Sequence, residues 1–527
     1  MKNAAATPPG SSPVRASAES GRREARRRAG WGRFFYGSAG AVALWPALLA
    51  LAVCLYRVAT PEMAQDELAT WSAASRTGAQ LIGMLHNVDA VHGTYYLFLH
   101  EWMRVFGDSL TSLRMPGVLA MTGAAALTAL VGRRLFDGRT GLIAGLVFAA
   151  LPSVSRYAQE VRSYALVTCA VTAATWLLLR ALDRPVWYRW LIYSCLVTVS
   201  GALHLASLTL LGGHGALVVL RWWRGRDRRP LVWFASAALV AVLPLLPLVS
   251  LGKRQVGRQL GWTAAPTFQS TAELWPQLFL SAAASIVVLT LVVLPLVLPR
   301  TRRGAAETWL LAAVPTVAIW ALSCGSTSYW LARYLLFTVP VWAVLAGAAL
   351  AAIRPRTFSV ILYAVLVVLA LPDQRALRGY TFHDWYTYPT MPPFNGSIST
   401  VDYTSAARTV AAGHQPGDGV VYIRGAAYFW RGVDAGMRHS MPRSVRMRDI
   451  FVDRSAVERN DLWAQECVPA AKCVGDERRI WVVTIGIEPG NPYPNLGAEQ
   501  IQALNASYSV TRTTTTDGIT ISLLERR

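Results

Sequence analysis

The chain has 527 residues, of which 53% are hydrophobic and only 15% are charged, and its mean hydropathy is +0.33. Ordinary soluble domains carry about 25% charged residues, so this composition argues against a purely cytosolic globular enzyme. The apolar content excludes disorder over most of the length, and six cysteines are too few for a disulfide-built scaffold. The formal net charge of +21 suggests nucleic acid as one partner, but the positions of the charges decide that question.

The N-terminal segment, 1–33, is polar and rich in arginine. Its basic stretch is too long for a cleavable secretory signal, and the apolar run after it continues to about Cys54 without a small-residue cleavage site. We therefore expect a disordered cytoplasmic tail that leads into an uncleaved first membrane span. A nucleic-acid-binding arm is the alternative interpretation.

Apolar runs long enough to cross about 30 Å of hydrocarbon recur along the chain. They predict about eleven transmembrane helices, at 36–57, 113–132, 140–156, 162–182, 187–204, 205–223, 231–251, 275–299, 306–323, 331–353 and 357–372. The fold class is therefore mainly α, a polytopic membrane protein with a transmembrane domain over 34–372.

Arginines set the expected orientation. Alternate short loops carry them, at Arg133/Arg134/Arg139, Arg180/Arg184/Arg189, Arg221/Arg224/Arg226/Arg228/Arg229, Arg300/Arg302/Arg303 and Arg354/Arg356. If every span crosses, these loops lie on the same side as the basic N-terminus, and that side is the cytoplasm. Orientation thus accounts for much of the positive charge, and no nucleic-acid partner is expected.

The exocytoplasmic side then receives the first loop, 58–112, and the polar segment 373–527. The second of these has strand-like runs at 420–424, 480–485 and 519–524 and helix-like stretches at 402–413 and 498–505, which predict an α/β domain. Cys467 and Cys473 both lie in it and are expected to form its one disulfide.

Acidic side chains are scarce before residue 373, and about half of them gather in the first loop, with Glu160 in the next loop on that side. Carboxylates at a membrane surface are costly and need a reason. Asp66 and Glu67 are candidates for a general base, with a solvated helix cap as the alternative. Asp89 and His92 are weak candidates for an acceptor or metal contact, since no third ligand is evident.

Basic residues also stand on the side where topology does not require them. Arg254 and Arg258 follow one span, Arg162 stands beside Glu160, and Arg333-Tyr334 opens another span. Arginine binds phosphate through a bidentate fork, so a lipid phosphate is the expected ligand, with ordinary anionic headgroups as the alternative. The segment 95–106 is amphipathic at helical spacing and is expected to lie in the membrane interface.

An ordered set of short motifs resembles one enzyme family. They are Gln65-Asp66-Glu67, Asp89-Ala90-Val91-His92-Gly93-Thr94-Tyr95-Tyr96, Arg104-Val105-Phe106-Gly107-Asp108-Ser109, Leu113-Arg114-Met115-Pro116, Gly132-Arg133-Arg134-Leu135-Phe136, Tyr157-Ala158-Gln159-Glu160-Val161-Arg162-Ser163-Tyr164-Ala165-Leu166 and Arg333-Tyr334-Leu335. The set is similar to the glycosyltransferase family 39 type of GT-C enzyme, which includes protein O-mannosyltransferases and resembles the aminoarabinose transferases of lipid A. Many relatives have His-Pro-Pro where this chain has His92-Gly93-Thr94.

The resemblance implies a multi-pass, inverting glycosyltransferase that uses a polyprenyl-phosphate sugar, with mannose as one candidate sugar. It implies Asp66 as base beside Glu67, Glu160 as a second acidic position, and later basic residues as phosphate ligands. The expected reaction is glycosylation of a hydroxyl on a glycan, lipid or protein at the outer face of the plasma membrane. No cofactor is certain, and a divalent cation stays open. A lipid-linked sugar transporter or flippase is the main alternative, and a structural membrane protein that binds a partner is a third.

Overall fold

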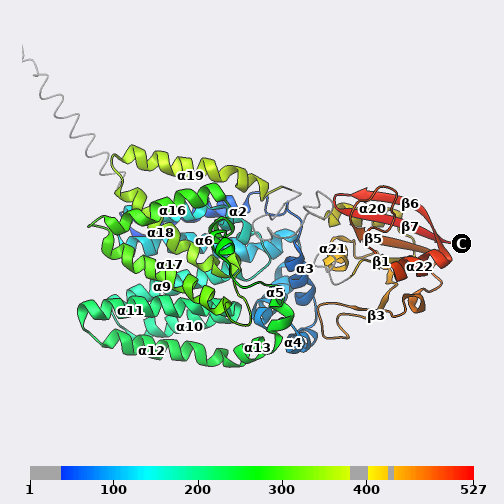
Figure 1. The fold of residues 1–527 in the computed structure, drawn as a ribbon, viewed down its shortest axis with the longest axis horizontal. Coiled ribbons are helices and arrows are strands. Elements are labelled where there is room, and N and C mark those ends of the chain that lie inside the picture. Colours follow the sequence, from blue (N-terminus) through cyan, green and yellow to red (C-terminus); the bar gives the residue numbers. More distant parts are fainter. Residues whose placement is uncertain (1–36, 380–400, 425–431) are drawn as a thin grey trace, which may run out of the picture.

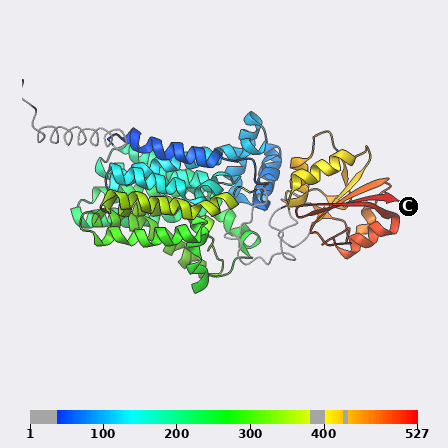
Figure 2. The same ribbon diagram turned by 90° about the horizontal axis from the view of Figure 1, so that it is seen from above.

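The computed structural model describes residues 37–379, 401–424 and 432–527, so the predicted tail 1–33 lies outside the described residues. The molecule is elongated along one axis, with a helical bundle at one end and an α/β region at the other (Figures 1 and 2). Three helices of the first loop lie between them. This arrangement agrees with the mainly α fold and the C-terminal α/β region that the sequence predicts.

Every predicted span coincides with a helix or a pair of helices. The bundle consists of α2 (Ala39–Leu55), α6 (Leu110–Leu135), α7 (Gly138–Ala150), α8 (Pro152–Ala158), α9 (Tyr164–Asp183), α10 (Trp187–Leu203), α11 (Leu210–Gly225), α12 (Arg229–Val242), α13 (Leu246–Leu260), α14 (Phe268–Ala272), α15 (Leu274–Phe279), α16 (Ala282–Val297), α17 (Arg302–Ser323), α18 (Val339–Ala352) and α19 (Arg356–Ala376). Short 3-10 turns, η1 (Ala90–His92), η2 (Leu205–Thr209), η3 (Leu243–Leu245) and η4 (Ala332–Thr338), connect some of them.

The number of spans is seven by length and apolarity, or nine if each bent pair is one span, within the described residues. The bent pairs are α7 with α8, at 63°, and α14–α15 with α16, at 100°. Helices α2 and α10 have 17 residues each, about 25 Å, which is slightly short of the hydrocarbon thickness. The expected count of eleven therefore stays a prediction.

Helix α18 lies at the centre of the bundle, where 89% of its apolar window is buried. Small residues let its neighbours approach closely: a Cβ placed on Gly347 would meet Ala144 of α7 at 2.7 Å. Inside a membrane such close packing replaces the hydrophobic driving force that operates in water. The centre of the bundle is therefore a tightly packed helical core.

Four of the basic loops gather at one end of the bundle. Arg134, at the end of α6, pairs with Asp183 at the end of α9. Asp183 also lies 3.8 Å from Arg221 of α11, which in turn bonds Glu307 of α17 at 2.7 Å. These loops thus lie on one side, as the arginine pattern predicts; that this side is the cytoplasm stays a prediction.

The first loop forms three helices at the opposite end of the bundle, α3 (Gln65–Ala74), α4 (Gly78–Asn87) and α5 (Gly93–Phe106). The predicted amphipathic segment is α5. It buries Tyr96 and Leu99 against the protein, whereas Phe98 and Val105, on the opposite face, are exposed. This division of faces fits a helix that lies along the membrane interface.

The α/β region contains a five-stranded sheet in the order β2-β1-β5-β7-β6. Its strands are β1 (Gly419–Tyr422), β2 (Arg448–Asp449), β5 (Arg479–Ile485), β6 (Tyr508–Thr516) and β7 (Ile519–Arg526), with β3 (Val452–Arg454) and β4 (Gln465–Glu466) as a separate pair. Its helices are α20 (Tyr403–Gly413), α21 (Val433–Ser440) and α22 (Ala498–Ser507). The three predicted strands and two predicted helices are present.

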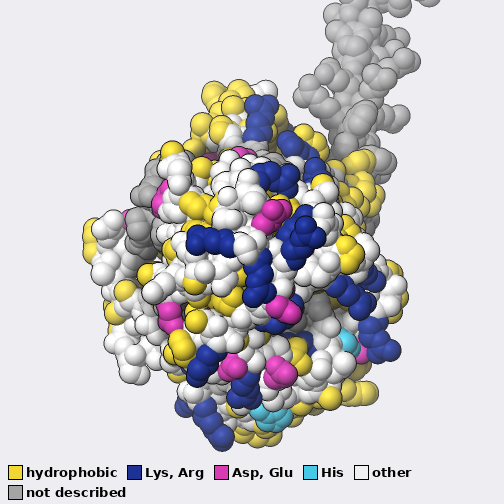
Figure 3. All heavy atoms as spheres, turned by 90° about the vertical axis from the view of Figure 1, so that its right-hand side faces the viewer, with side chains coloured by type: hydrophobic (Ala, Val, Ile, Leu, Met, Phe, Trp, Pro, Cys, Tyr) yellow, Lys and Arg dark blue, Asp and Glu magenta, His cyan; other side chains and the backbone are white. Residues whose placement is uncertain are grey.

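Sequence patterns did not predict α21, β6 or the short strands β2, β3 and β4. Strand β6 is a mostly exposed edge strand rich in threonine, so it lacks the apolar alternation that marks a half-buried strand. Cys467 and Cys473 form the expected disulfide. The end face of the region carries Lys, Arg, Asp and Glu side chains interspersed, as a water-facing surface does (Figure 3). The exact domain boundary at 372/373 stays a prediction.

Candidate functional site

Helix α3 presents two consecutive carboxylates in its first turn. Neighbouring positions on a helix point about 100° apart, so the two side chains enter different surroundings. The side chain of Asp66 is 26% exposed, whereas that of Glu67 is only 2% exposed. An incoming hydroxyl can therefore reach Asp66 but not Glu67.

Asp66 is held between two arginines from distant parts of the chain. Its Oδ1 lies 3.3 Å from Arg162, which precedes α9, and its Oδ2 lies 3.3 Å from Arg333 in η4. Burial alone would raise the pKa of Asp66, but Arg162, Arg333 and His92 outweigh that effect and lower the pKa to about 2. The carboxylate is therefore ionised near neutral pH.

Glu67 anchors the first loop to the bundle through hydrogen bonds. Its carboxylate accepts hydrogen bonds from Arg114 of α6 at 3.3 Å and from the backbone N–H of Val161 at 3.0 Å. Arg114 also donates to the carbonyls of Val58 and Pro61, both at 2.8 Å. Because all of these atoms are buried, Glu67 and Arg114 form a structural ion pair that fixes the chain after α2.

Glu160 is the third carboxylate of the site and is buried. It lies 3.2 Å from Arg156 of α8. Burial raises the pKa of Glu160 to about 7; Arg156 opposes this rise, and the negative charges of Glu67 and Asp66 add to it. Glu160 thus titrates near neutral pH, in contrast to Asp66.

Arg162 connects Asp66 to the turn around Asp89. Its guanidinium donates to the hydroxyls of Thr70 at 3.3 Å and Tyr96 at 3.1 Å. Tyr96 in turn donates to Asp89 at 2.8 Å, and Asp89 accepts a second bond from Gln259 at 2.8 Å. Asp89 is therefore engaged within the protein, in a left-handed turn with φ 58°.

Aromatic and imidazole rings pack against one another beside Asp66. The ring centroid of His204 lies 4.4 Å from that of Tyr334 and 6.0 Å from that of His92. Tyr164 packs against His204 at 5.6 Å. Burial, followed by the charge of Arg162, lowers the pKa of His92 to about 3, so this imidazole is neutral at physiological pH.

The remaining basic candidates lie elsewhere. Arg258 of α13 pairs with Asp461 of the α/β region at 2.9 Å, and it is half-exposed. Arg254 of α13 is exposed. The contacts thus bring Arg162, Arg333 and Tyr334 to the surroundings of Asp66, but they engage Arg258 with the other region.

Several residues of the site were not predicted from the sequence. Arg114, Tyr96 and Tyr164 lie inside the quoted motifs, so only the motif as a whole could have pointed to them. Arg156 and His204 end the predicted spans 140–156 and 187–204, and an ionisable side chain at such a position was the available signal for them. Within the described ranges, no group of three or more His, Cys, Asp or Glu side chains is arranged to hold a metal ion.

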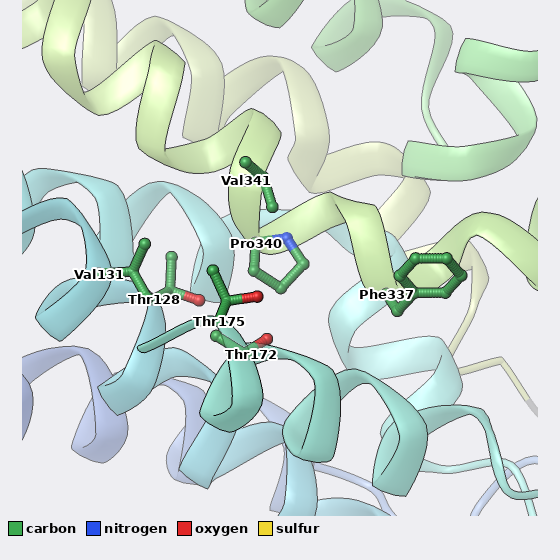
Figure 4. Close-up of a pocket in the computed structure, with 7 residues that line it drawn as sticks. All are labelled: Thr128, Val131, Thr172, Thr175, Phe337, Pro340 and Val341. Atoms are coloured by element: carbon green, nitrogen blue, oxygen red, sulfur yellow. The ribbon is translucent and has the colours of Figure 1, made fainter. Parts of the chain in front are cut away.

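A separate cavity lies in the bundle core among α6, α9, η4 and α18 (Figure 4). Its lining residues are Thr128, Val131, Thr172, Thr175, Phe337, Pro340 and Val341. The three threonine hydroxyls donate to carbonyls of their own helices. The cavity therefore has an apolar lining without charged groups and offers no acid–base chemistry.

One family model and two solved structures are similar to this chain. Residues 94–250 match the family model described as dolichyl-phosphate-mannose-protein mannosyltransferase. The structure of ArnT from Cupriavidus metallidurans bound to undecaprenyl phosphate is similar, with a TM-score of 0.60 at 13% identity, over 92% of this chain and 98% of that chain. Its apo structure has a TM-score of 0.58 at 12% identity, over 91% and 97% of the two chains. No curated protein sequence matches.

Proposed function

We propose that this membrane protein is a glycosyltransferase that passes a sugar from a polyprenyl phosphate to an acceptor hydroxyl. The match of residues 94–250 to the dolichyl-phosphate-mannose-protein mannosyltransferase model and the fold shared with ArnT support this proposal. The acceptor belongs to a glycan, a lipid or a protein. Mannose is one candidate sugar, in keeping with the name of the matching family. The reaction is assigned to the outer face of the plasma membrane, because the basic loops gather at the opposite end of the bundle.

The observation that carries the proposal is the position of Asp66 between Arg162 and Arg333. A base for the acceptor and two cations for a phosphate come from three separate segments and meet at the end of the bundle that faces the α/β region. The carboxylate can accept the proton of the attacking hydroxyl. The guanidinium groups can stabilise the negative charge on the departing phosphate.

In the proposed step, the acceptor oxygen attacks the anomeric carbon of the donor sugar while Asp66 takes the hydroxyl proton. The new glycosidic C–O bond forms as the bond between that carbon and the phosphate oxygen breaks. The electron pair of the broken bond leaves with the polyprenyl phosphate, next to Arg162 and Arg333. Attack from the face opposite the leaving group inverts the configuration at the anomeric carbon.

The arginine pair links donor binding to the strength of the base. Without a donor, both guanidinium groups lower the pKa of Asp66 to about 2, against the effect of burial, which makes the carboxylate a weak proton acceptor. A donor phosphate shares the positive charge of Arg162 and Arg333. The pKa of Asp66 then rises, so the base becomes effective when the donor is in place.

The other candidates take supporting roles in this proposal. Glu67 positions the loop through Arg114, and Glu160 adjusts the electrostatic field around Asp66 as its protonation changes. Tyr334 and His92 stand beside the reacting groups, where they can contact the sugar or the phosphate. Asp89 orients Tyr96, and Arg254 and Arg258 serve the lipid-facing or domain-facing surface.

The test is a transfer assay on purified protein in lipid vesicles that contain polyprenyl-phosphate mannose, with mass spectrometry of the glycosylated product. Asp66→Asn removes the base at nearly constant volume and should lower the transfer rate by about 10²–10⁴-fold, with donor binding retained. Asp183→Asn, which alters a carboxylate at the other end of the bundle, is the matched control. Wild-type turnover in Asp66→Asn would refute the assignment of the base.

The transporter alternative is tested in the same vesicles. A flippase moves the lipid-linked sugar between leaflets and forms no glycoside. Movement of labelled donor without any product, unaffected by Asp66→Asn, would favour that alternative. The position of the carboxylates in a loop rather than along a path through the spans favours transfer.

A further inference from the structure

Arg76, directly after α3, is a buried cation. Only 5% of its surface is exposed. Its Nη2 donates to the backbone carbonyl of Asp461 in the α/β region, while its Nε and Nη1 have no hydrogen-bond partner. No carboxylate within the described ranges forms an ion pair with it; the carboxylate of Asp461 is taken by Arg258 at 2.9 Å and lies 3.6 Å from Arg459.

A second donor without a partner lies on the same segment. Trp71, near the end of α3, is 9% exposed, and its indole Nε1 has no acceptor. The Trp71 ring packs edge-on against His439 of α21, with centroids 5.1 Å apart. Arg438, the neighbour of His439, acts electrostatically on Arg76: burial and the charge of Arg438 lower the pKa of Arg76, and the charges of Asp461 and Tyr96 only partly oppose them. The contact region between α3 and α21 thus concentrates positive charge and free N–H groups.

Burying a cation without a hydrogen-bonded ion-pair partner is costly, and buried donors are almost always satisfied. The unsatisfied atoms of Arg76 and Trp71 are all donors, so they need an acceptor, and the positive charges of Arg76 and Arg438 favour one with negative charge. Arginine and indole N–H groups together suit the oxygens of a phosphate or carboxylate.

Arg76 is also connected to the proposed reacting groups through Tyr96. Tyr96 is close enough to Arg76 to affect its pKa, and its hydroxyl accepts a bond from Arg162, the partner of Asp66. Arg76 and Tyr96 therefore interact electrostatically, and Tyr96 contacts the arginine that pairs with Asp66.

We propose that Arg76 and Trp71 form an oxyanion subsite between the first loop and the α/β region, which holds a phosphate or carboxylate group next to the hydroxyl that receives the sugar. The inference rests on the proposed function for the role of the subsite, but not for its existence. The oxyanion belongs either to the acceptor itself or to a lipid headgroup at the membrane surface.

The subsite is tested with inorganic phosphate on the purified full-length protein, with thermal unfolding as the readout and ionic strength held constant with chloride. We expect a saturable rise of Tm in the wild type. Arg76→Gln should weaken the apparent phosphate affinity at least tenfold, and Trp71→Phe, which removes the N–H donor and keeps an aromatic ring, should weaken it several-fold. Arg104→Gln, which alters an exposed arginine paired with Glu101 on α5, should bind phosphate like the wild type.

A second arm separates this subsite from the donor site, because phosphate can also bind between Arg162 and Arg333. The Arg333→Gln variant should keep a saturable rise of Tm with phosphate. Adding Arg76→Gln to that variant should remove the rise. A response that depends on Arg333 alone, or no saturable response in the wild type, would overturn the proposal. Should Arg76→Gln fail to fold, Arg76→Lys and Trp71→Phe decide it, and wild-type affinity in both would overturn it.

Transfer kinetics then identify the source of the oxyanion, and each result supports the subsite. A higher acceptor KM in Arg76→Gln, with the donor KM unchanged, assigns the group to the acceptor. A rate that depends on anionic lipid in the wild type but not in Arg76→Gln assigns it to a headgroup. Because phosphate binding needs no donor sugar, loss of the proposed transferase activity would leave this result independent.

Discussion

The two ends of the helical bundle both carry arginine–carboxylate clusters, yet they differ in burial. At the end with the basic loops, the side chains of Arg134 and Asp183 are 44% and 30% exposed. At the other end, those of Arg114 and Glu67 are 1% and 2% exposed. The same residue types therefore form solvent-exposed pairs in one place and a buried structural ion pair in the other. Desolvation accounts for this difference, since exposed pairs are worth little and buried charges depend strongly on their partners.

The largest expected effect comes from breaking the buried ion pair between Glu67 and Arg114. Glu67→Gln leaves the charge of Arg114 uncompensated, so we expect the free energy of unfolding to fall by about 3–5 kcal/mol. Asp183→Asn, at the exposed end, should change it by at most about 1 kcal/mol. Denaturation of the purified protein in detergent measures both variants. Equal losses would contradict the contrast between the two ends.

The titration of Glu160 gives the next effect. Burial raises the pKa of Glu160 to about 7, from an ordinary value of 4.5, so the folded protein holds a proton that the unfolded chain releases between these values. Stability should therefore fall by roughly 3 kcal/mol as pH rises from about 4.5 to 7, and then level off. Asp66, whose pKa is lowered to about 2, acts in the opposite direction but only below its ordinary value of 3.8.

Glu160→Gln provides the control for that titration. The amide is neutral at every pH and nearly matches the volume of the carboxyl group. The variant should lose this decrease in stability between pH 4.5 and 7. If the variant and the wild type have parallel stability curves across this range, Glu160 does not carry the raised pKa.

The sequence predicted the helices more reliably than the contacts between them. Long apolar runs and alternating arginine loops are local patterns, so the spans and their shared ends could be read from the chain. The pairing of Asp66 with Arg333 could be expected only as a shared membrane face. Asp66 and Glu67 differ in burial and in their partners because of packing with α6 and the loop before α9. Two adjacent acidic residues in a sequence give no local signal for this difference.

Donor binding should depend on Arg333, one of the two arginines that hold Asp66. Arg333→Gln removes a phosphate ligand and also one of the charges that lower the pKa of Asp66. We expect the donor KM to rise about tenfold, equivalent to about 1.4 kcal/mol. Because Asp66 must be ionised to act as base, the acid limb of kcat/KM should move to higher pH.

A pH–rate profile of the wild type and of Arg333→Gln checks both parts. Arg134→Gln, which alters an arginine of the exposed cluster, should leave the donor KM and the profile unchanged. An unshifted acid limb in Arg333→Gln would mean that Arg333 does not act on Asp66 during the reaction.

The smallest expected effect separates two roles for Arg258, which stood among the expected phosphate ligands. Its side chain is 54% exposed and bonds Asp461, so it connects α13 with the α/β region. Solvent screens such a pair, and Arg258→Gln should cost at most about 1 kcal/mol of stability with an unchanged donor KM. A raised donor KM would return Arg258 to the phosphate site. An unchanged value would confine phosphate binding to the buried arginines, because only there does the low-dielectric environment make a guanidinium group strongly selective for an anion.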